Sequence, residues 1–228
     1  MHHRPSIFQL AMGESFNKLH PKIAERFSVG VGSGTACVAT GVMSQIWHGS
    51  AIYAPFLRLG ASRHILFPER GVDVPFTMEN WPYLDRAGRE TVTFNRTFEL
   101  PNRRRRFDAT MVYDRATDQV FDYLGTHQHV LAPLEFTAAD DGGLVIRGGQ
   151  LRFLMRGFNV KVPTLVTGRA EVHERFDDRR GHFRISVRVT NPWFGPLFGY
   201  EGTFSCAYID LSRSRTPACA KPLVEVVR

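Results

Sequence analysis

The chain has 228 residues, of which 43% are hydrophobic and 12% aromatic, so it is long and apolar enough to build a folded core. The formal net charge of +7 permits an anionic partner without requiring one. The apolar runs fall short of the roughly 20 residues of a membrane-spanning helix, and no membrane span is expected. The N-terminus lacks an apolar stretch with a small-residue cleavage site, so we expect no signal peptide. Three cysteines without paired spacing argue against a disulfide framework or a zinc site and favour a cytoplasmic protein.

Residues 6–28 are predicted to form helix. Apolar side chains recur there at spacings of three and four, which places them on one helical face. These residues are Phe8, Met12, Phe16, Leu19, Ile23 and Phe27. Pro21 disfavours the helical conformation at the residue before it, His20, so a break is expected there. A second, short helix is expected over residues 50–60, between Ser50 as its N-cap and Gly60 as its stop.

Strands dominate the rest of the sequence. One is predicted over residues 36–47, and from residue 64 onward strand-like segments follow one another, separated by turn signals. The turn signals lie at residues 85–88, 114–118, 139–143, 177–181 and 191–196. Such a series predicts an α+β fold in which a strongly curved antiparallel sheet or half-open β-barrel packs on the N-terminal helices. We expect one domain over residues 1–211 and an irregular tail over residues 212–228.

Four consecutive arginines, residues 103–106, begin the strand predicted before the turn at 114–118. Alternate side chains of a strand point to opposite faces, so Arg103 and Arg105 share one face and Arg104 and Arg106 the other. A nucleic-acid site needs several arginines on one surface with aromatic rings between them, so nucleic acid is not an expected partner. We interpret the run as protection of a turn and a sheet edge, with the gripping of an acidic group at a pocket rim as a second interpretation.

Two charged residues, Arg96 and Glu174, share strand faces with apolar side chains. A charge that faces a core is costly unless it is paired or faces a wet cavity. One interpretation is a structural ion pair between the two residues. The other is that both anchor an otherwise apolar ligand in a cavity, where the small residues Gly168 and Ala170 leave room for it.

Residues 191–204 combine glycine and proline with five aromatic rings. This composition is typical of a hairpin packed by aromatic residues, or of a hydrophobic lid at a pocket mouth. In the strand predicted over residues 106–114, Met111 and Tyr113 share the apolar face with Phe107 and Ala109. The candidate ligand-binding residues are therefore Arg96, Met111, Tyr113, Trp193, Phe198, Tyr200 and Phe204.

The sequence lacks the motifs of the common catalytic sites. His127 and His129 are spaced to share a strand face, but no third metal ligand is marked, so no metal is expected. A Gly-x-Ser-x-Gly elbow and a dinucleotide fingerprint are absent, and no cofactor is expected. What remains is acid–base chemistry by a buried carboxylate, with a tyrosine to hold an oxyanion. The candidate catalytic residues are Glu79, Asp108 and Glu174, and the candidate tyrosines are Tyr113 and Tyr200.

Several segments resemble a bacterial family known only as a domain of unknown function (4166). The most specific are "RTFELPNRRRRFDATMVYD" at residues 96–114 and "NPWFGPLFGYEGTF" at residues 191–204, and the resemblance runs from about residue 15 to 210. Members of the family occur alone or fused to reductase domains of the saccharopine-dehydrogenase type. The resemblance therefore implies a place in small-molecule metabolism and a separate reductase as a partner, but it implies no activity.

Three functions stay open at this point. The leading hypothesis is the binding of an apolar or amphipathic small molecule in a β-barrel-like cavity, in bacterial secondary or lipid metabolism. The alternative is a cofactor-independent isomerase, cyclase or lyase that uses a buried carboxylate as its acid or base. The third is a protein-interaction module without a cavity, whose arginines meet an acidic partner.

Overall fold

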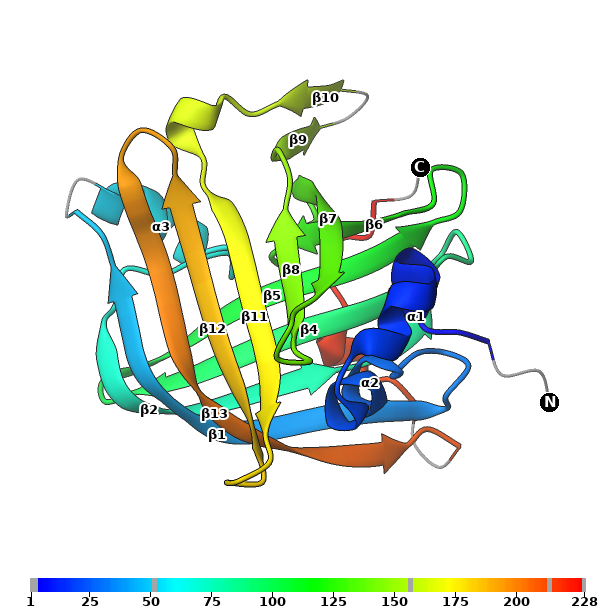
Figure 1. Cartoon of the computed structure of the whole chain (residues 1–228). Coiled ribbons are helices and arrows are strands. Elements are labelled where there is room, and N and C mark those ends of the chain that lie inside the picture. Colours follow the sequence, from blue (N-terminus) through cyan, green and yellow to red (C-terminus); the bar gives the residue numbers. More distant parts are fainter. Residues whose placement is uncertain (1–3, 51–52, 156–157, 213–214, 227–228) are drawn as a thin grey trace.

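The computed structural model describes residues 4–50, 53–155, 158–212 and 215–226 (Figure 1). Within these residues the strands form a 13-stranded antiparallel sheet. Ten of them close into a barrel in the order β7, β6, β5, β4, β2, β1, β13, β12, β11 and β8, because β8 pairs with β7 again. The predicted α+β fold is confirmed, and the curved sheet closes completely.

Most barrel strands alternate between inward apolar and outward polar side chains, while β5, β6 and β7 also carry apolar side chains on the outer face. Their bounds are β1 Thr35–His48, β2 Gly71–Asn80, β4 Glu90–Leu100, β5 Arg103–Asp114, β6 Gln119–Leu124, β7 Val130–Ala138, β8 Leu144–Gly148, β11 Arg169–Asp177, β12 His182–Asn191 and β13 Gly195–Asp210. Three short strands pair outside the closed circuit, namely β3 Pro82–Leu84, β9 Arg152–Met155 and β10 Phe158–Lys161.

The helices are short. They are α1 Ile7–Met12, α2 Pro21–Phe27 and α3 Ala54–Ala61, with 3-10 turns η1 Gly13–Lys18, η3 Thr164–Val166 and η4 Ala218–Ala220. No helix in the described part of the chain is long and apolar enough to cross a membrane. The predicted break before Pro21 is present, and the imidazole Nδ1 of His20 caps α2 by accepting a hydrogen bond from Lys22 N at 3.2 Å. The second predicted helix begins at Ala54 rather than at residue 50.

Two predicted strands are interrupted. The strand-like segment over residues 143–155 divides into β8 and β9, because Gly149 leaves the ladder and donates its N–H to the Pro133 carbonyl at 2.8 Å. Residues 164–166 open the strand-like segment predicted over residues 164–176, but they form η3 after Pro163, whose fixed φ suits a helical start. The tail contains η4 and is tied to the barrel, since Asn95 Nδ2 donates to the Ala220 carbonyl at 2.8 Å.

The two ends of the barrel differ. The chain enters β1 directly from α2 and leaves it toward α3, so the N-terminal helices lie at one end and α3 lies at the other (Figure 1). At the helical end Phe8 meets the rings of Phe27 and Phe136, with centroids 4.9 and 5.5 Å apart. Ser6 caps α1 by accepting from Gln9 N at 3.2 Å, and its hydroxyl donates to the Phe27 carbonyl at 2.7 Å. These contacts fill the helical end of the interior.

Candidate ligand-binding site

A pocket of about 410 Å³ lies at the α3 end of the barrel interior. We call it the barrel pocket. Phe56 and Leu57 of α3 cover it, and inward side chains such as Leu134 and Val189 form its walls. Small residues make the space, because Ala132, Gly148, Gly168 and Ala170 all line it. Pockets of about 300–1,000 Å³ with mostly apolar walls are typical sites for small molecules.

Asp122 is the charged residue among the described residues that line the barrel pocket. It lies on β6 between Val120 and Leu124, and the alternation of the strand turns all three side chains inward. The residue is partly accessible from the pocket, yet its Oδ1 atom is covered and has no hydrogen-bond partner among the described residues. Burial raises the pKa of Asp122 to about 6, against the opposing influence of the Arg96 charge. A carboxyl group in this state can accept or donate a hydrogen bond near neutral pH.

Arg96 is buried next to Phe107, which forms part of the wall of the barrel pocket. It is 5% exposed, and its guanidinium carbon lies 4.9 Å from the ring centroid of Phe107, which lines the pocket, and 5.3 Å from that of Phe94. The hydroxyl of Tyr200 lies near this guanidinium, and burial raises its pKa. Within the described residues, neither Arg96 Nε nor the Tyr200 hydroxyl has a hydrogen-bond partner. The interior beside the pocket thus holds a cation, a phenol and a carboxyl group with unused hydrogen-bonding capacity.

Glu174 pairs with Arg26 of α2 and not with Arg96. Arg26 Nε donates to Glu174 Oε1, and Arg26 Nη2 lies 3.4 Å from Glu174 Oε2. Arg26 Nη1 also donates to Asn80 Oδ1 at 2.9 Å and contacts Cys37 Sγ at 3.3 Å. Burial by itself would lower the pKa of Arg26, but the charge of Glu174, its hydrogen bond and the neighbouring Cys37 and Cys206 together outweigh burial, and the pKa is raised. The ion pair between Arg96 and Glu174, one of the two interpretations of these residues, is therefore not formed, because α2 supplies the partner of Glu174.

Two other candidate carboxylates lie on the outer face of the sheet. Glu79 accepts a hydrogen bond from Trp81 Nε1 at 2.7 Å. Asp108 is buried under the loop that precedes β2 and pairs with His64 Nδ1 at 3.0 Å and with Arg106 Nη2 at 2.9 Å. The strand alternation that turns Phe107 inward turns Asp108 outward, so neither carboxylate is near the barrel pocket.

The candidate aromatic residues separate into core and surface. Met111, Phe198, Tyr200 and Phe204 are buried in the barrel core, and the Tyr113 hydroxyl donates to Asp118. Trp193 is 72% exposed in the turn between β12 and β13. The barrel pocket is lined by their neighbours Phe194 and Leu197 and by none of the candidate residues. Asp122 is not among the residues predicted from the sequence, although it carries the same signal as Arg96, a charge between inward apolar neighbours.

Comparison with known proteins assigns the chain to a family. Residues 19–204 match the model of the family described as "Domain of unknown function (DUF4166)". The chain belongs to the DUF4166 family. It is also 38% identical over 190 residues to "Uncharacterized protein YndH" of Bacillus subtilis (strain 168), an alignment that covers 83% of this chain and 92% of YndH. The predicted family resemblance is confirmed.

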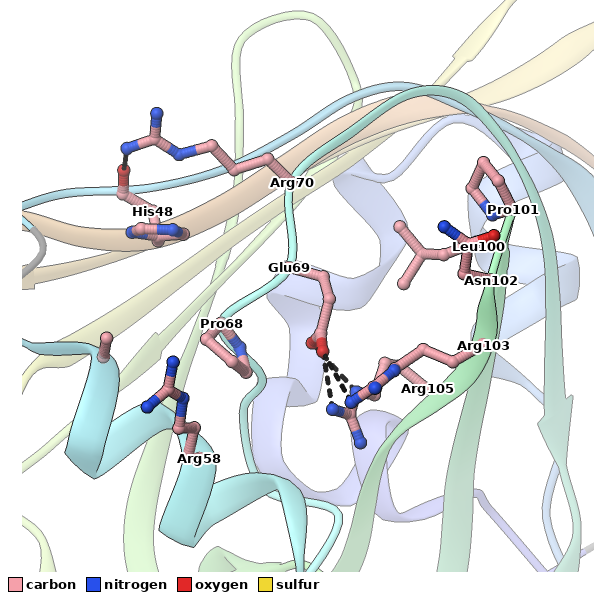
Figure 2. Close-up of a pocket in the computed structure, with 11 residues that line it drawn as sticks. His48, Arg58, Pro68, Glu69, Arg70, Leu100, Pro101, Asn102, Arg103 and Arg105 are labelled. Atoms are coloured by element: carbon pink, nitrogen blue, oxygen red, sulfur yellow. Dashed lines mark hydrogen bonds and ion pairs between the residues drawn. The ribbon is translucent and has the colours of Figure 1, made fainter.

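This DUF4166 chain also carries a basic cleft on the rim beside α3, defined by Arg58, Glu69, Arg70, Arg103 and Arg105 (Figure 2). The cleft has a volume of about 750 Å³. Glu69 accepts from Arg105 Nε at 2.8 Å and Nη2 at 2.5 Å, and from Arg103 Nη1 at 3.4 Å. Arg58 rises into the cleft from α3, and Arg70 turns toward the His48 carbonyl, to which it donates at 3.0 Å (Figure 2). The cleft lining thus holds one carboxylate and four guanidinium groups, and those of Arg103 and Arg105 contact the carboxylate.

The four arginines of residues 103–106 alternate as the strand predicts. Arg103 and Arg105 point into the basic cleft, whereas Arg104 pairs with Glu99 at 2.7 Å and Arg106 with Asp108 at 2.9 Å. The run therefore divides between two faces of the rim.

The histidine pair of this DUF4166 protein does not extend to a larger cluster. His127 and His129 stack with ring centroids 5.7 Å apart. The described residues contain no group of three or more His, Cys, Asp or Glu side chains placed to hold a metal ion.

Proposed function

We propose that this protein binds an amphipathic small molecule, with the apolar body of the molecule in the barrel pocket and a hydroxyl or amino group at Asp122. The observation that carries the proposal is the unpartnered carboxyl group in an apolar pocket of about 410 Å³. A buried polar group without a partner is costly, and a ligand that donates a hydrogen bond to it removes that cost. The presence of the pocket favours ligand binding over a protein-interaction module without a cavity.

The chemistry of the pocket limits the class of ligand. Its lining is apolar apart from a few groups such as Asp122, Thr167 and Asn191. Asn191 is already engaged, because its Nδ2 donates to the Thr167 carbonyl at 2.6 Å and its Oδ1 accepts from Trp193 N at 2.8 Å. Asp122 is therefore the group that orients a ligand. The implied role in secondary or lipid metabolism, and the separate reductase, stay predictions from the family resemblance.

Ala170→Phe is expected to abolish this binding by filling the pocket. The probe is N-phenyl-1-naphthylamine, an apolar amine whose fluorescence rises in an apolar site. We expect wild-type protein to bind it, and the variant to bind it at least about tenfold more weakly, a loss of ~1.4 kcal/mol. Ala207→Phe adds the same ring to an exposed position on β13 and should leave the affinity unchanged. Equal affinities of wild type and Ala170→Phe, with both proteins folded by circular dichroism, contradict the proposal.

A second candidate function is proton transfer on the bound molecule. The observation that favours it is Asp122, because burial brings its pKa to about 6, where a carboxyl group can both take and give a proton near neutral pH. Asp122 replaces Glu174, Glu79 and Asp108 in this role, since each of those carboxylates has a partner away from the pocket. The reaction is then an isomerisation, cyclisation or elimination without a cofactor.

Hydrogen exchange separates binding from catalysis. A molecule that co-purifies with the protein is identified by native mass spectrometry and then incubated with the protein in D₂O. An enzyme of this class should introduce deuterium at a C–H position of the molecule, and Asp122→Asn should stop the exchange while retaining the molecule. Exchange at the same rate with both proteins rules Asp122 out as the base.

A further inference from the structure

Large apolar side chains are exposed at the α3 end beyond those that line the barrel pocket. On α3, Phe56 is 62% and Leu59 is 70% exposed, and Trp193 in the β12–β13 turn is 72% exposed. Phe56 borders the pocket, but Leu59 and Trp193 do not line it. Binding of a small molecule inside the barrel therefore does not account for the exposure of Leu59 and Trp193. Exposed apolar residues gathered in one region mark a contact surface rather than ordinary surface variation.

The fold brings these residues to a common end of the barrel. Figure 1 shows α3, η3 and the β12–β13 turn at the upper left, away from α1 and α2 at the right. Tyr53 at the start of α3 meets Phe194 of the turn with ring centroids 6.0 Å apart, so the two segments are in contact. Leu165 of η3 is also exposed and lines the same pocket mouth. Phe56, Leu165 and Phe194 thus border the entrance to the barrel pocket, and Leu59 and Trp193 are their neighbours on α3 and in the β12–β13 turn. We call Phe56, Leu59, Leu165, Trp193 and Phe194 the apolar rim.

The basic cleft adjoins the apolar rim. Arg58 lies on α3 between Phe56 and Leu59, and Arg103 and Arg105 stand at the start of β5 on the same end of the barrel (Figure 2). The described residues lining the cleft hold four arginines against one carboxylate, Glu69. Aromatic side chains beside excess arginine match the two layers of a bilayer surface, because rings insert at the headgroup level and guanidinium groups attract anionic lipid headgroups.

We infer that the α3 end of the barrel docks on an anionic membrane surface. The apolar rim inserts at the boundary between headgroups and acyl chains, and the basic cleft contacts the headgroups. The docked orientation places the entrance of the barrel pocket against the bilayer. An amphipathic ligand then passes between membrane and pocket without crossing water, which deepens the proposed function by giving the source of the ligand.

Vesicle sedimentation tests the inference on the full chain without any ligand. Vesicles of phosphatidylcholine alone are compared with vesicles that also contain phosphatidylglycerol. We expect binding to the anionic vesicles and much weaker binding to the neutral ones. Leu59→Ser with Trp193→Ser, and separately Arg58→Gln with Arg103→Gln, should each weaken binding, the arginine pair by on the order of twentyfold. In wild-type protein, bromine on the lipid acyl chains should quench tryptophan fluorescence, since Trp193 is the tryptophan exposed at this end.

Matched changes at the helical end serve as controls. Arg179→Gln with Arg180→Gln removes the same charge from the exposed β11–β12 turn, and Tyr208→Ser removes an exposed ring near the end of β13. Both should bind the anionic vesicles nearly as well as wild type. Absence of binding, equal binding to neutral and anionic vesicles, or equal losses in the control variants overturns the inference. Binding of the naphthylamine probe is measured without vesicles, so failure of membrane docking is distinguishable from failure of the pocket proposal.

Discussion

Arg26→Ala is expected to destabilise the protein by about 3–5 kcal/mol, because it leaves the carboxylate of Glu174 buried without a partner. The side chains of Arg26 and Glu174 are 1% and 3% exposed, so water cannot replace the lost guanidinium. The change also removes a hydrogen-bond donor from Asn80 and packing between α2 and the barrel. Urea unfolding followed by circular dichroism measures the loss.

The neighbouring surface pair provides the comparison. Arg147 and Glu171 join β8 to β11 with Arg147 Nε 2.8 Å from Glu171 Oε2, and both side chains are about half-exposed. Arg147→Ala should therefore cost less than about 1 kcal/mol. In the Arg26→Ala background, Glu174→Gln should recover part of the stability, because it removes the uncompensated charge. Equal losses for Arg26→Ala and Arg147→Ala contradict a structural role for the buried pair.

Asp122→Asn is expected to stabilise the protein at neutral pH by about 1–3 kcal/mol. Burial raises the pKa of Asp122 to about 6, so the native protein holds a proton that the unfolded chain releases at lower pH. The stability associated with this proton is fully present below the unfolded pKa, near 4, and is lost as the pH rises through about 6. The gain from the variant should be absent at pH 4, grow between pH 4 and 6, and level off above pH 6. The measurement is the free energy of unfolding across this pH range.

The Asp→Asn change at position 141 should alter stability in the opposite direction and serves as the control. Although the partial burial of Asp141 acts to raise its pKa, hydrogen bonds from the Gly143 N–H and from His173 lower it. Asp141→Asn should thus lose stability above the unfolded pKa rather than gain it. If Asp122→Asn shows no pH-dependent gain, the carboxyl group is not held in its protonated form. The acid–base proposal then loses the raised pKa on which it depends.

Most of the fold can be predicted from local patterns in the sequence. Period-two alternation and turn signals identified the barrel strands, and Pro21 marked the start of α2. The alternation also divided the arginines of residues 103–106 correctly between two faces, with Arg105 at Glu69 and Arg104 at Glu99. These features follow from the backbone of each segment and need no knowledge of its neighbours.

The partners of the buried charges follow only from the tertiary structure. Periodicity shows that Arg96 and Glu174 face inward. It cannot show that Arg26 of α2, 148 residues from Glu174 along the chain, pairs with Glu174. Asp122 had the inward pattern of a strand charge, yet its position at a pocket depends on closure of the β7–β8 pair and on α3 covering that end. Local sequence therefore determined the strands, their faces and the class of fold. Closure of the barrel decided which end is filled by helices and which end holds the pocket, because contacts between distant segments are not encoded in the period of any one of them.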